Sequence, residues 1–217
     1  MIRRLDLPDT AGAVDGSGLL HAPSADRNRE AILEALLPRL PRQGDVLELA
    51  SGTGQHIAAL AAHRPDLSFH PTEPDPERRA AIDARCRGLS NVAPAGDVDA
   101  CTPGWSLEGT AEAVMVVNLL HLISDAEMSV LLDEAVRVLS PGGLLAIYGP
   151  FLRGGVATSP GDLTFDASLR AQDSAIGFKE VEVVETVLVA MGLEVERIAM
   201  PANNLMIIGR VPTLPGF

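Results

Sequence analysis

The sequence predicts an α/β fold, a mostly parallel sheet of seven strands with helices on both faces and an antiparallel hairpin at its C-terminal end. Short apolar runs alternate with helical patterns along the chain, which is typical of parallel strands joined by crossover helices. Only the five residues 200–204 separate the last two apolar runs, 193–199 and 205–211. A link this short allows an antiparallel pair, whereas a parallel pair needs a crossover.

Length and composition indicate one soluble domain. The chain has 217 residues, of which 47% are hydrophobic and 21% are charged, and this suits a single α/β domain with a substantial core. No apolar run approaches the roughly 20 residues that a membrane span requires. Arg3 and Arg4 are not followed by an apolar segment, so we predict no signal peptide, no membrane binding and a cytoplasmic location.

The charge balance argues against nucleic acid as a partner. The formal net charge is −12, and aromatic residues make up only 3% of the chain. Phosphate binding relies on clustered Lys and Arg, and base stacking relies on aromatic rings, so we expect a small-molecule substrate. Cys86 and Cys101 lack the spacing of metal ligands, so we predict reduced thiols and no metal. The oligomeric state stays open, with a homodimer as one alternative.

Residues 1–22 include several glycines and are predicted to form a flexible arm, ahead of a single domain over 23–217. Ser24 or Asp26 is a candidate cap for the first long helix. Arg27 falls in the first turns of that helix, where the helix dipole favours anions. Arg27 therefore either has a partner, such as a carboxylate, or is solvated on an exposed turn.

The stretch 45–56 is predicted to form a strand, a tight turn and the start of a helix. Gly52 and Gly54 would let the backbone approach a ligand closely, and the helix N-terminus offers unpaired N–H groups. This combination is typical of a nucleotide site. A dinucleotide fingerprint would place a third glycine where Ile57 stands, which weakens the case for NAD.

Acidic residues follow the next two predicted strands, 67–72 and 91–95. Glu73 comes 19 residues after Gly54, close to the spacing expected for an acid that binds a ribose diol. The alternative role for an acid here is a helix cap, which suits Asp75 better than Glu73. Asp97 follows the third strand.

The longest apolar run, 111–120, suits a central strand, and it ends in polar residues at the sheet edge where ligands collect in open α/β folds. Ser124 and Glu127 have the spacing of a capping box for the following helix. Residues 152–180 interrupt the alternation of strands and helices. We interpret them as a substrate cover, with a surface decoration as the alternative.

Glu48 lies in the first strand, four residues before Gly52. This E-x-x-x-G-x-G arrangement resembles motif I of the class I S-adenosylmethionine-dependent methyltransferases, which have a Rossmann-like fold. The resemblance implies S-adenosylmethionine as the cofactor, with Asp97 at the adenine amino group and Asp99 as its competitor. The cofactor-binding residues expected are Arg27, Asn28, Glu48, Ala50, Ser51, Gly52, Gly54, His56, Glu73, Asp97, Val98 and Asn118.

Taken together, the blocks ADRNRE, ASGTGQH, YGPF, FDASLR and MPANN occur in one order along the chain. They are similar to those of a family of methyltransferase-like proteins found in bacteria and animals, over roughly Ala22 to Arg210. That family usually has aspartate where Glu73 stands, and glutamate can still bind a diol. It usually has an aromatic residue near Ile176, so its substrate does not carry over.

Methyl transfer needs alignment of the reacting atoms and, for a hydroxyl acceptor, removal of a proton. His121 follows the central strand and is the candidate base, with a purely structural histidine as the alternative. Tyr148 is a candidate for orienting the acceptor. Asp166 and Arg170 are one helical turn apart and would equally form a structural ion pair. The acceptor-binding residues expected are His121, Tyr148, Phe151, Phe165, Arg170 and Asn203.

The sequence therefore predicts an S-adenosylmethionine-dependent methyltransferase that acts on a small molecule. Two alternatives stay open. One is an enzyme that binds the same cofactor but catalyses a cyclisation or an elimination, and the other is a noncatalytic binding protein.

Overall fold

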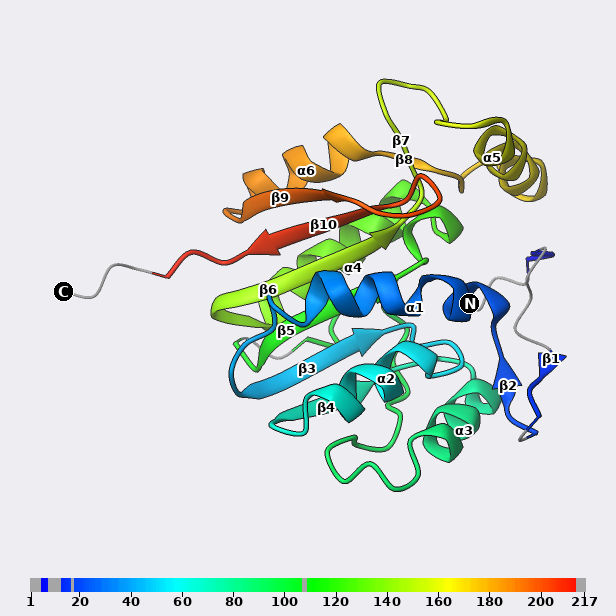
Figure 1. Ribbon diagram of the computed structural model, residues 1–217. Helices are drawn as coiled ribbons and strands as arrows, with labels where there is room; N and C mark the ends of the chain where they lie inside the picture. Colours follow the sequence, from blue (N-terminus) through cyan, green and yellow to red (C-terminus); the bar gives the residue numbers. More distant parts are fainter. Residues whose placement is uncertain (1–4, 8–12, 17, 107–108, 214–217) are drawn as a thin grey trace. The chain divides into compact units, whose positions relative to one another are not determined.

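The computed structural model describes residues 5–7, 13–16, 18–106 and 109–213 (Figure 1). The chain divides into two compact units, Met1–Asp99 and Ala100–Phe217. Within the described residues the fold is α/β, with six main strands, mostly parallel, an antiparallel C-terminal hairpin and six α-helices. This confirms the predicted class. None of the described helices is long and apolar enough to cross a membrane.

The first unit is built on two parallel strands, β3 (Gly44–Leu49) and β4 (Leu67–Pro71). Its helices are α1 (Pro23–Leu36), α2 (Gln55–His63) and α3 (Pro76–Arg85). Helix α2 packs on β4 and on α1 (Figure 1). The apolar side chains between these elements are fully buried, among them Ile32, Val46, Leu49, Ile57, Leu60 and Phe69.

Two short strands form in the N-terminal part of this unit. Part of the predicted arm, residues 1–4, 8–12 and 17, lies outside the described residues. The described part contains β1 (Ala13–Val14) and β2 (Leu20–His21), which pair antiparallel. Helix α1 begins at Pro23 with Ala22 at the N-cap position and no side-chain cap, so the predicted cap at Ser24 or Asp26 is wrong. Proline in the first turn suits a helix start because its missing N–H would be unpaired there anyway.

The seventh strand expected at 91–95 is not confirmed. Only isolated bridges form there, from Phe69 to Val92 and from Thr72 to Gly96. The Phe69 N–H donates to the Asn91 carbonyl and the Ala93 N–H donates to the Phe69 carbonyl, both at 2.8 Å. The next ladder bond would run from residue 71 of β4 to the Ala93 carbonyl, but Pro71 has no N–H. The Ala95 N–H donates instead to the Asp83 carboxylate at 2.8 Å, so no continuous ladder forms.

The second unit is built on β5 (Ala111–Val117) and β6 (Leu139–Gly149), which are parallel. Helix α4 (Asp125–Val138) connects them, and Ser124 and Glu127 form the predicted capping box at its start. After α6 (Val181–Ala190), β9 (Glu194–Ala199) and β10 (Leu205–Arg210) form the predicted hairpin. Strand β10 also pairs antiparallel with β6.

The predicted cover, 152–180, contains one long helix, α5 (Pro160–Gln172). The short parallel strands β7 (Phe151–Leu152) and β8 (Lys179–Glu180) pair with each other and flank it. Figure 1 shows α5 set apart from the β9–β10 hairpin, beyond the β7–β8 pair.

Gly177, between α5 and β8, should tolerate no side chain. Its φ is +131°, and an added Cβ would lie 2.7 Å from the Arg170 guanidinium carbon and 2.7 Å from an Asp166 carboxylate oxygen. We expect Gly177→Ala to lower the free energy of unfolding by about 3 kcal/mol through backbone strain and steric overlap.

Urea denaturation measures this loss, and Gly192→Ala is the matched control. Gly192 has φ +90° but nothing within 4 Å of an added Cβ, so only backbone strain of about 1 kcal/mol applies. Equal losses in the two variants would show that the contact with Arg170 and Asp166 does not constrain Gly177.

Candidate functional site

The turn between β3 and α2 is held open by left-handed backbone conformations. Ala50, Gly52 and Gly54 have φ of 51°, 59° and 75°. An added Cβ at Gly54 would lie 3.1 Å from the Ile82 Cα, so this glycine lets the turn pack against α3. A Cβ at Gly52 would meet nothing within 4 Å. Gly52 is therefore the position where the bare main chain leaves room for a ligand.

Glu48, at the end of β3 beneath this turn, is a buried carboxyl group with an unused oxygen. Its Oε2 is buried and has no hydrogen-bond partner within the part of the chain that the structure describes. Burial raises the pKa of Glu48 to about 8, the Ser51 hydroxyl beside it lowers that pKa, and the Glu73 carboxyl raises it further. Glu48 is thus protonated at pH 7 in this state, and a positively charged group placed beside it would favour ionisation.

Glu73 lies at the turn, as the spacing predicts. Its Oε2 accepts a hydrogen bond from the Gly52 N–H at 3.0 Å, and its Oε1 accepts one from the Asp75 N–H at 3.3 Å. Burial raises the pKa of Glu73, and Arg78 opposes this shift. Asp75 is the N-cap of α3 and accepts from the Glu77 and Arg78 N–H groups. The structure therefore separates the two roles, with Asp75 as the cap and Glu73 at the turn.

The predicted adenine-site loop is tied to the end of β4. The Glu73 N–H donates to the Gly96 carbonyl at 3.0 Å. The Asp97 carboxylate is 71% exposed and pairs with Arg79 at 3.0 Å, and the same guanidinium donates to the Glu73 carbonyl at 2.8 Å. Val98 lies beside Gly96. Sequence reasoning missed Arg79, since a basic residue in a helix carries no signal of such a contact.

The predicted residues of α1 and α2 meet in one pair. The Nε2 atom of His56 lies 2.7 Å from the Asn28 Oδ1. Burial lowers the pKa of His56 to about 4, and Arg29 lowers it further while Asp26 raises it. The ring is therefore neutral at pH 7, and it donates to Asn28 from Nε2. Arg27 is exposed on α1.

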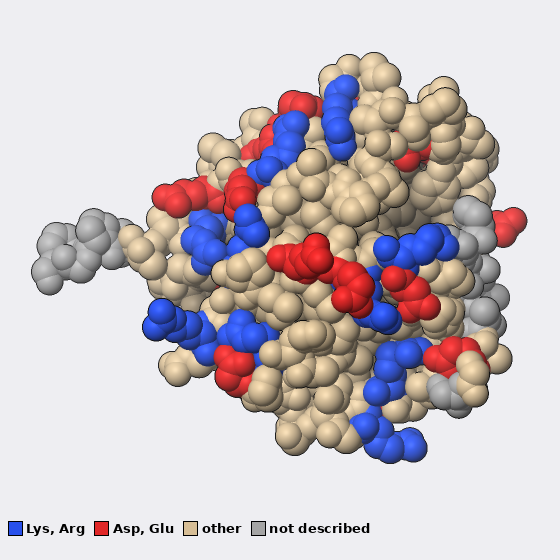
Figure 2. Space-filling model, viewed as in Figure 1, with Lys and Arg blue, Asp and Glu red and all other residues tan. Residues whose placement is uncertain are grey.

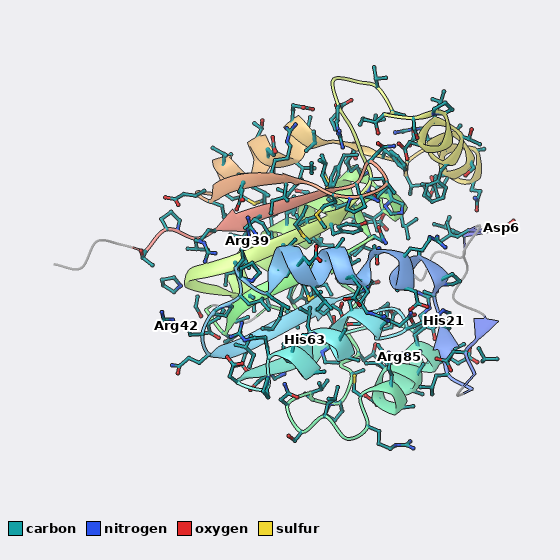
Figure 3. All side chains as sticks on the ribbon, in the orientation of Figure 1. Asp6, His21, Arg39, Arg42, His63 and Arg85 are labelled. Atoms are coloured by element: carbon teal, nitrogen blue, oxygen red, sulfur yellow. The ribbon has the colours of Figure 1, made fainter. Side chains whose placement is uncertain are left out.

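Two residues that the sequence did not single out join the glycine turn to β2. The Arg85 guanidinium donates to the carbonyls of Thr53 at 2.9 Å and Leu20 at 2.8 Å. Gln55 accepts from the Ala22 N–H and from the Thr53 hydroxyl, both at 2.7 Å. Figure 3 labels Arg85, on α3, and His21, on β2. The main chain around the turn is thus fixed from the side of β2.

In the second unit, Asn118 and His121 follow the end of β5. Asn118 has φ 55°, and its N–H donates to the Tyr148 carbonyl at 2.8 Å. An added Cβ at Gly149 would lie 3.8 Å from both the Asn118 Oδ1 and the His121 Nδ1. Asn118, His121 and the end of β6 therefore converge, and Tyr148 is buried directly before Gly149.

His121 belongs to a cluster of three aromatic rings, which we call the aromatic cluster: His121, Phe165 and Phe178. Each pair meets edge to face, with ring centroids 5.7 to 6.0 Å apart. Burial lowers the pKa of His121 to about 4, Lys179 lowers it further and Asp166 raises it. The imidazole is therefore neutral at pH 7 and a weaker base than a solvated imidazole.

Arg170 is engaged with the protein. Its Nε donates to the Asp166 carboxylate at 2.9 Å and its NH2 donates to the Phe178 carbonyl at 3.1 Å, which confirms the predicted ion pair. The Asn203 side chain donates to Asp162 at 3.2 Å. Phe151 is buried. Substrate binding by these three residues stays a prediction.

The pH dependence of stability tests the state of Glu48. Because its folded pKa of about 8 exceeds the usual 4.5, the folded protein holds a proton that the unfolded chain releases. The wild type should therefore lose stability as pH rises, by about 3 kcal/mol between pH 5 and pH 8 from this group alone. The amide side chain of the Glu48→Gln variant cannot ionise. Urea denaturation at pH 5 and at pH 8 should therefore show a smaller loss in the free energy of unfolding for this variant than for the wild type.

The control is Glu34→Gln, which changes an exposed carboxylate of α1 and should keep the wild-type dependence. If Glu48→Gln also keeps the wild-type pH dependence of stability, Glu48 is ionised in the folded protein and the protonated state assigned to it is wrong.

The titration of His121 is a separate test. We expect nitrogen and carbon chemical shifts of the labelled ring to show a neutral imidazole down to pH 5, with a midpoint near 4. Lys179→Met should raise that midpoint because a positive charge is removed. A wild-type midpoint between 6 and 7 would contradict the burial of this ring.

Comparison with solved structures identifies similar folds. An O-methyltransferase family protein from Burkholderia thailandensis has a TM-score of 0.73 at 18% identity, covering 85% of this chain and 57% of that protein. Human N-acetylserotonin methyltransferase in complex with S-adenosylmethionine has a TM-score of 0.72 at 16% identity, and the match covers 88% of this chain and 53% of that protein. The S-adenosylmethionine-dependent methyltransferase SibL in its apo form has a TM-score of 0.69 at 20% identity, and the match covers 87% of this chain and 56% of that protein.

The chain thus spans just over half the length of these structures, and at such identities the likeness shows a shared Rossmann-like fold alone. Residues 20–210 match the family described as "Protein of unknown function (DUF938)", and the chain belongs to that family.

Proposed function

We propose that the protein is an S-adenosylmethionine-dependent methyltransferase that acts on a small-molecule acceptor. The observation that carries the proposal is the buried Glu48 carboxyl, whose Oε2 has no partner among the described residues and lies beneath the glycine turn. A cationic ligand held against the turn would give that oxygen a partner and favour its ionisation. Gly52, where an added Cβ would meet nothing, supplies the room for such a ligand.

The residues present in the first unit fit the proposed cofactor. Glu48 would hold its positively charged part, and Glu73, which already accepts from the Gly52 N–H, would accept hydrogen bonds from a ribose diol. Asp97 and Val98 would bound its adenine. When bound, S-adenosylmethionine supplies an electrophilic methyl group on a positively charged sulfur.

In the second unit we propose that His121 removes the proton of a hydroxyl acceptor. Its neutral ring has a free electron pair for this, and Nδ1 faces Gly149 at the end of β6. Tyr148 would orient the acceptor. The aromatic rings of Phe165 and Phe178 enclose the histidine and keep water from it.

The charge distribution supports a small molecule rather than nucleic acid. The chain carries a net charge of −12. Figure 2 shows acidic and basic side chains interspersed on the visible face, where a phosphate backbone would call for a continuous basic stripe.

Calorimetric titration with S-adenosylmethionine tests the cofactor assignment. We expect the wild type to bind it and not to bind NAD. Glu73→Gln should weaken binding about tenfold or more, because hydrogen bonds to a charged carboxylate are lost. Glu77→Gln, an exposed change in the first turn of α3, should bind like the wild type. A wild type that gives no heat with S-adenosylmethionine would overturn the proposal.

The products of turnover separate methylation from the other chemistry that the same cofactor supports. Methyl transfer releases one S-adenosylhomocysteine for each acceptor converted. Conversion of an acceptor without that release would assign the protein to a cyclisation or elimination instead.

A further inference from the structure

Arg153, directly after β7, holds a buried donor that the protein does not use. Its NH2 group donates to the Asn203 carbonyl at 2.8 Å. Its Nε is buried and has no hydrogen-bond partner in the described part of the chain. Buried polar atoms without partners are rare in native proteins, and each calls for a physical explanation.

Three other arginines of the second unit have carboxylate partners. Arg137 pairs with Glu134 at 3.0 Å, Arg170 pairs with Asp166 at 2.9 Å and Arg197 pairs with Glu182 at 3.3 Å. Arg153 forms no such ion pair with any described residue. A guanidinium is always charged and presents planar donors that match the oxygens of a carboxylate or phosphate. An anionic ligand would match this unused donor.

The position of Arg153 favours a ligand of the proposed active site. Strand β6 ends at Gly149, opposite Leu205 of β10, and the neighbouring β5 ends opposite Tyr148. Arg153 thus follows the same strand edge as Asn118 and His121. This carboxyl edge is where open α/β sheets bind ligands.

The β9–β10 hairpin turn positions the guanidinium. Ala202 and Asn203 both have left-handed φ values, 54° and 60°, as the two central residues of a turn closed by the Asn204 N–H and the Pro201 carbonyl at 3.3 Å. This turn presents the Asn203 carbonyl to Arg153. Gly154 and Gly155 follow Arg153 and carry no side chains, and the Glu180 Oε1 lies 3.8 Å from the position of an added Cβ at Gly155, so a carboxylate borders this approach. The Asp162 carboxylate, which Asn203 also contacts, already accepts from the hydroxyls of Thr158 and Ser159.

We propose that Arg153 binds an oxyanion, a carboxylate or a phosphate, carried by the acceptor molecule. The acceptor class is then an acid. This inference rests on the proposed function, because the sheet edge that Arg153 follows also holds the residues proposed to act on the acceptor. Arg153 takes the recognition role for which the sequence suggested Arg170.

The test uses the full chain with ¹⁵N-labelled arginine and three aromatic probes: benzoate, phenyl phosphate and the neutral benzamide. The Arg153 Nε–H signal, assigned by its loss in Arg153→Gln, should shift saturably with at least one anion and not with benzamide. The preferred anion distinguishes a carboxylate from a phosphate. Calorimetry should show its affinity falling about tenfold or more in Arg153→Gln, with partial retention in Arg153→Lys.

Arg42→Gln is the matched control, because it removes one positive charge from an exposed site in the first unit (Figure 3). It should bind the anion like the wild type. Binding of S-adenosylmethionine to Arg153→Gln, measured separately, should be unchanged, which shows that the variant is folded.

The inference fails if neither anion shifts the Arg153 signal, or if Arg153→Gln and Arg153→Lys both bind the anion like the wild type. A wild type that binds the anion through Arg153 but not S-adenosylmethionine would overturn the proposed function alone, and Arg153 would remain an anion site.

Discussion

The hydrogen bond from the Gly52 N–H to the Glu73 carboxylate is the contact around which the first unit is arranged. Parallel pairing of β3 and β4 brings Glu48 opposite Pro71, and the Thr72 N–H continues the ladder to the Glu48 carbonyl at 2.9 Å. Glu73, two residues after Pro71, then lies beside the turn that contains Gly52. A slip of one residue between the two strands would direct its side chain to the opposite face. The register of two short strands therefore fixes the geometry of the candidate cofactor site.

Burial gives both units ionisable groups in their neutral form. In the first unit Glu48 and Glu73 lie close together, and low polarity keeps a proton on Glu48. In the second unit the aromatic rings around His121 keep a proton off the imidazole. Burial thus makes Glu48 a weaker acid and His121 a weaker base than the same groups in water. Neither shift requires a metal or a paired charge.

The parts that the sequence predicted well depend on short-range patterns. The distance from Gly54 to Glu73 follows from one strand–turn–helix unit, and the capping box of Ser124 and Glu127 lies within four residues. The ion pair of Asp166 and Arg170 follows from the pitch of one helix. Each of these was predictable because one local element determines it.

The features of the fold and the site that the sequence did not predict depend on long side chains or on single residues. Arg85 reaches a carbonyl 65 residues earlier in the chain, and Arg153 reaches one 50 residues later. The periodic pattern of apolar residues in the sequence does not indicate such contacts. The strand expected at 91–95 forms only isolated bridges because Pro71 of β4 cannot donate to it and the Ala95 N–H donates to Asp83, although the apolar pattern favoured a strand.

The place of β10 between β6 and β9 has a consequence for how the second unit folds. The β9–β10 hairpin closes locally, but β6 gains its antiparallel neighbour only when residues 205–210 have been synthesised. Until then residues 144–149 of β6 have one unpaired edge, with N–H and C=O groups able to pair with other chains. The nascent polypeptide is therefore most prone to aggregation in the interval between translation of β6 and translation of β10.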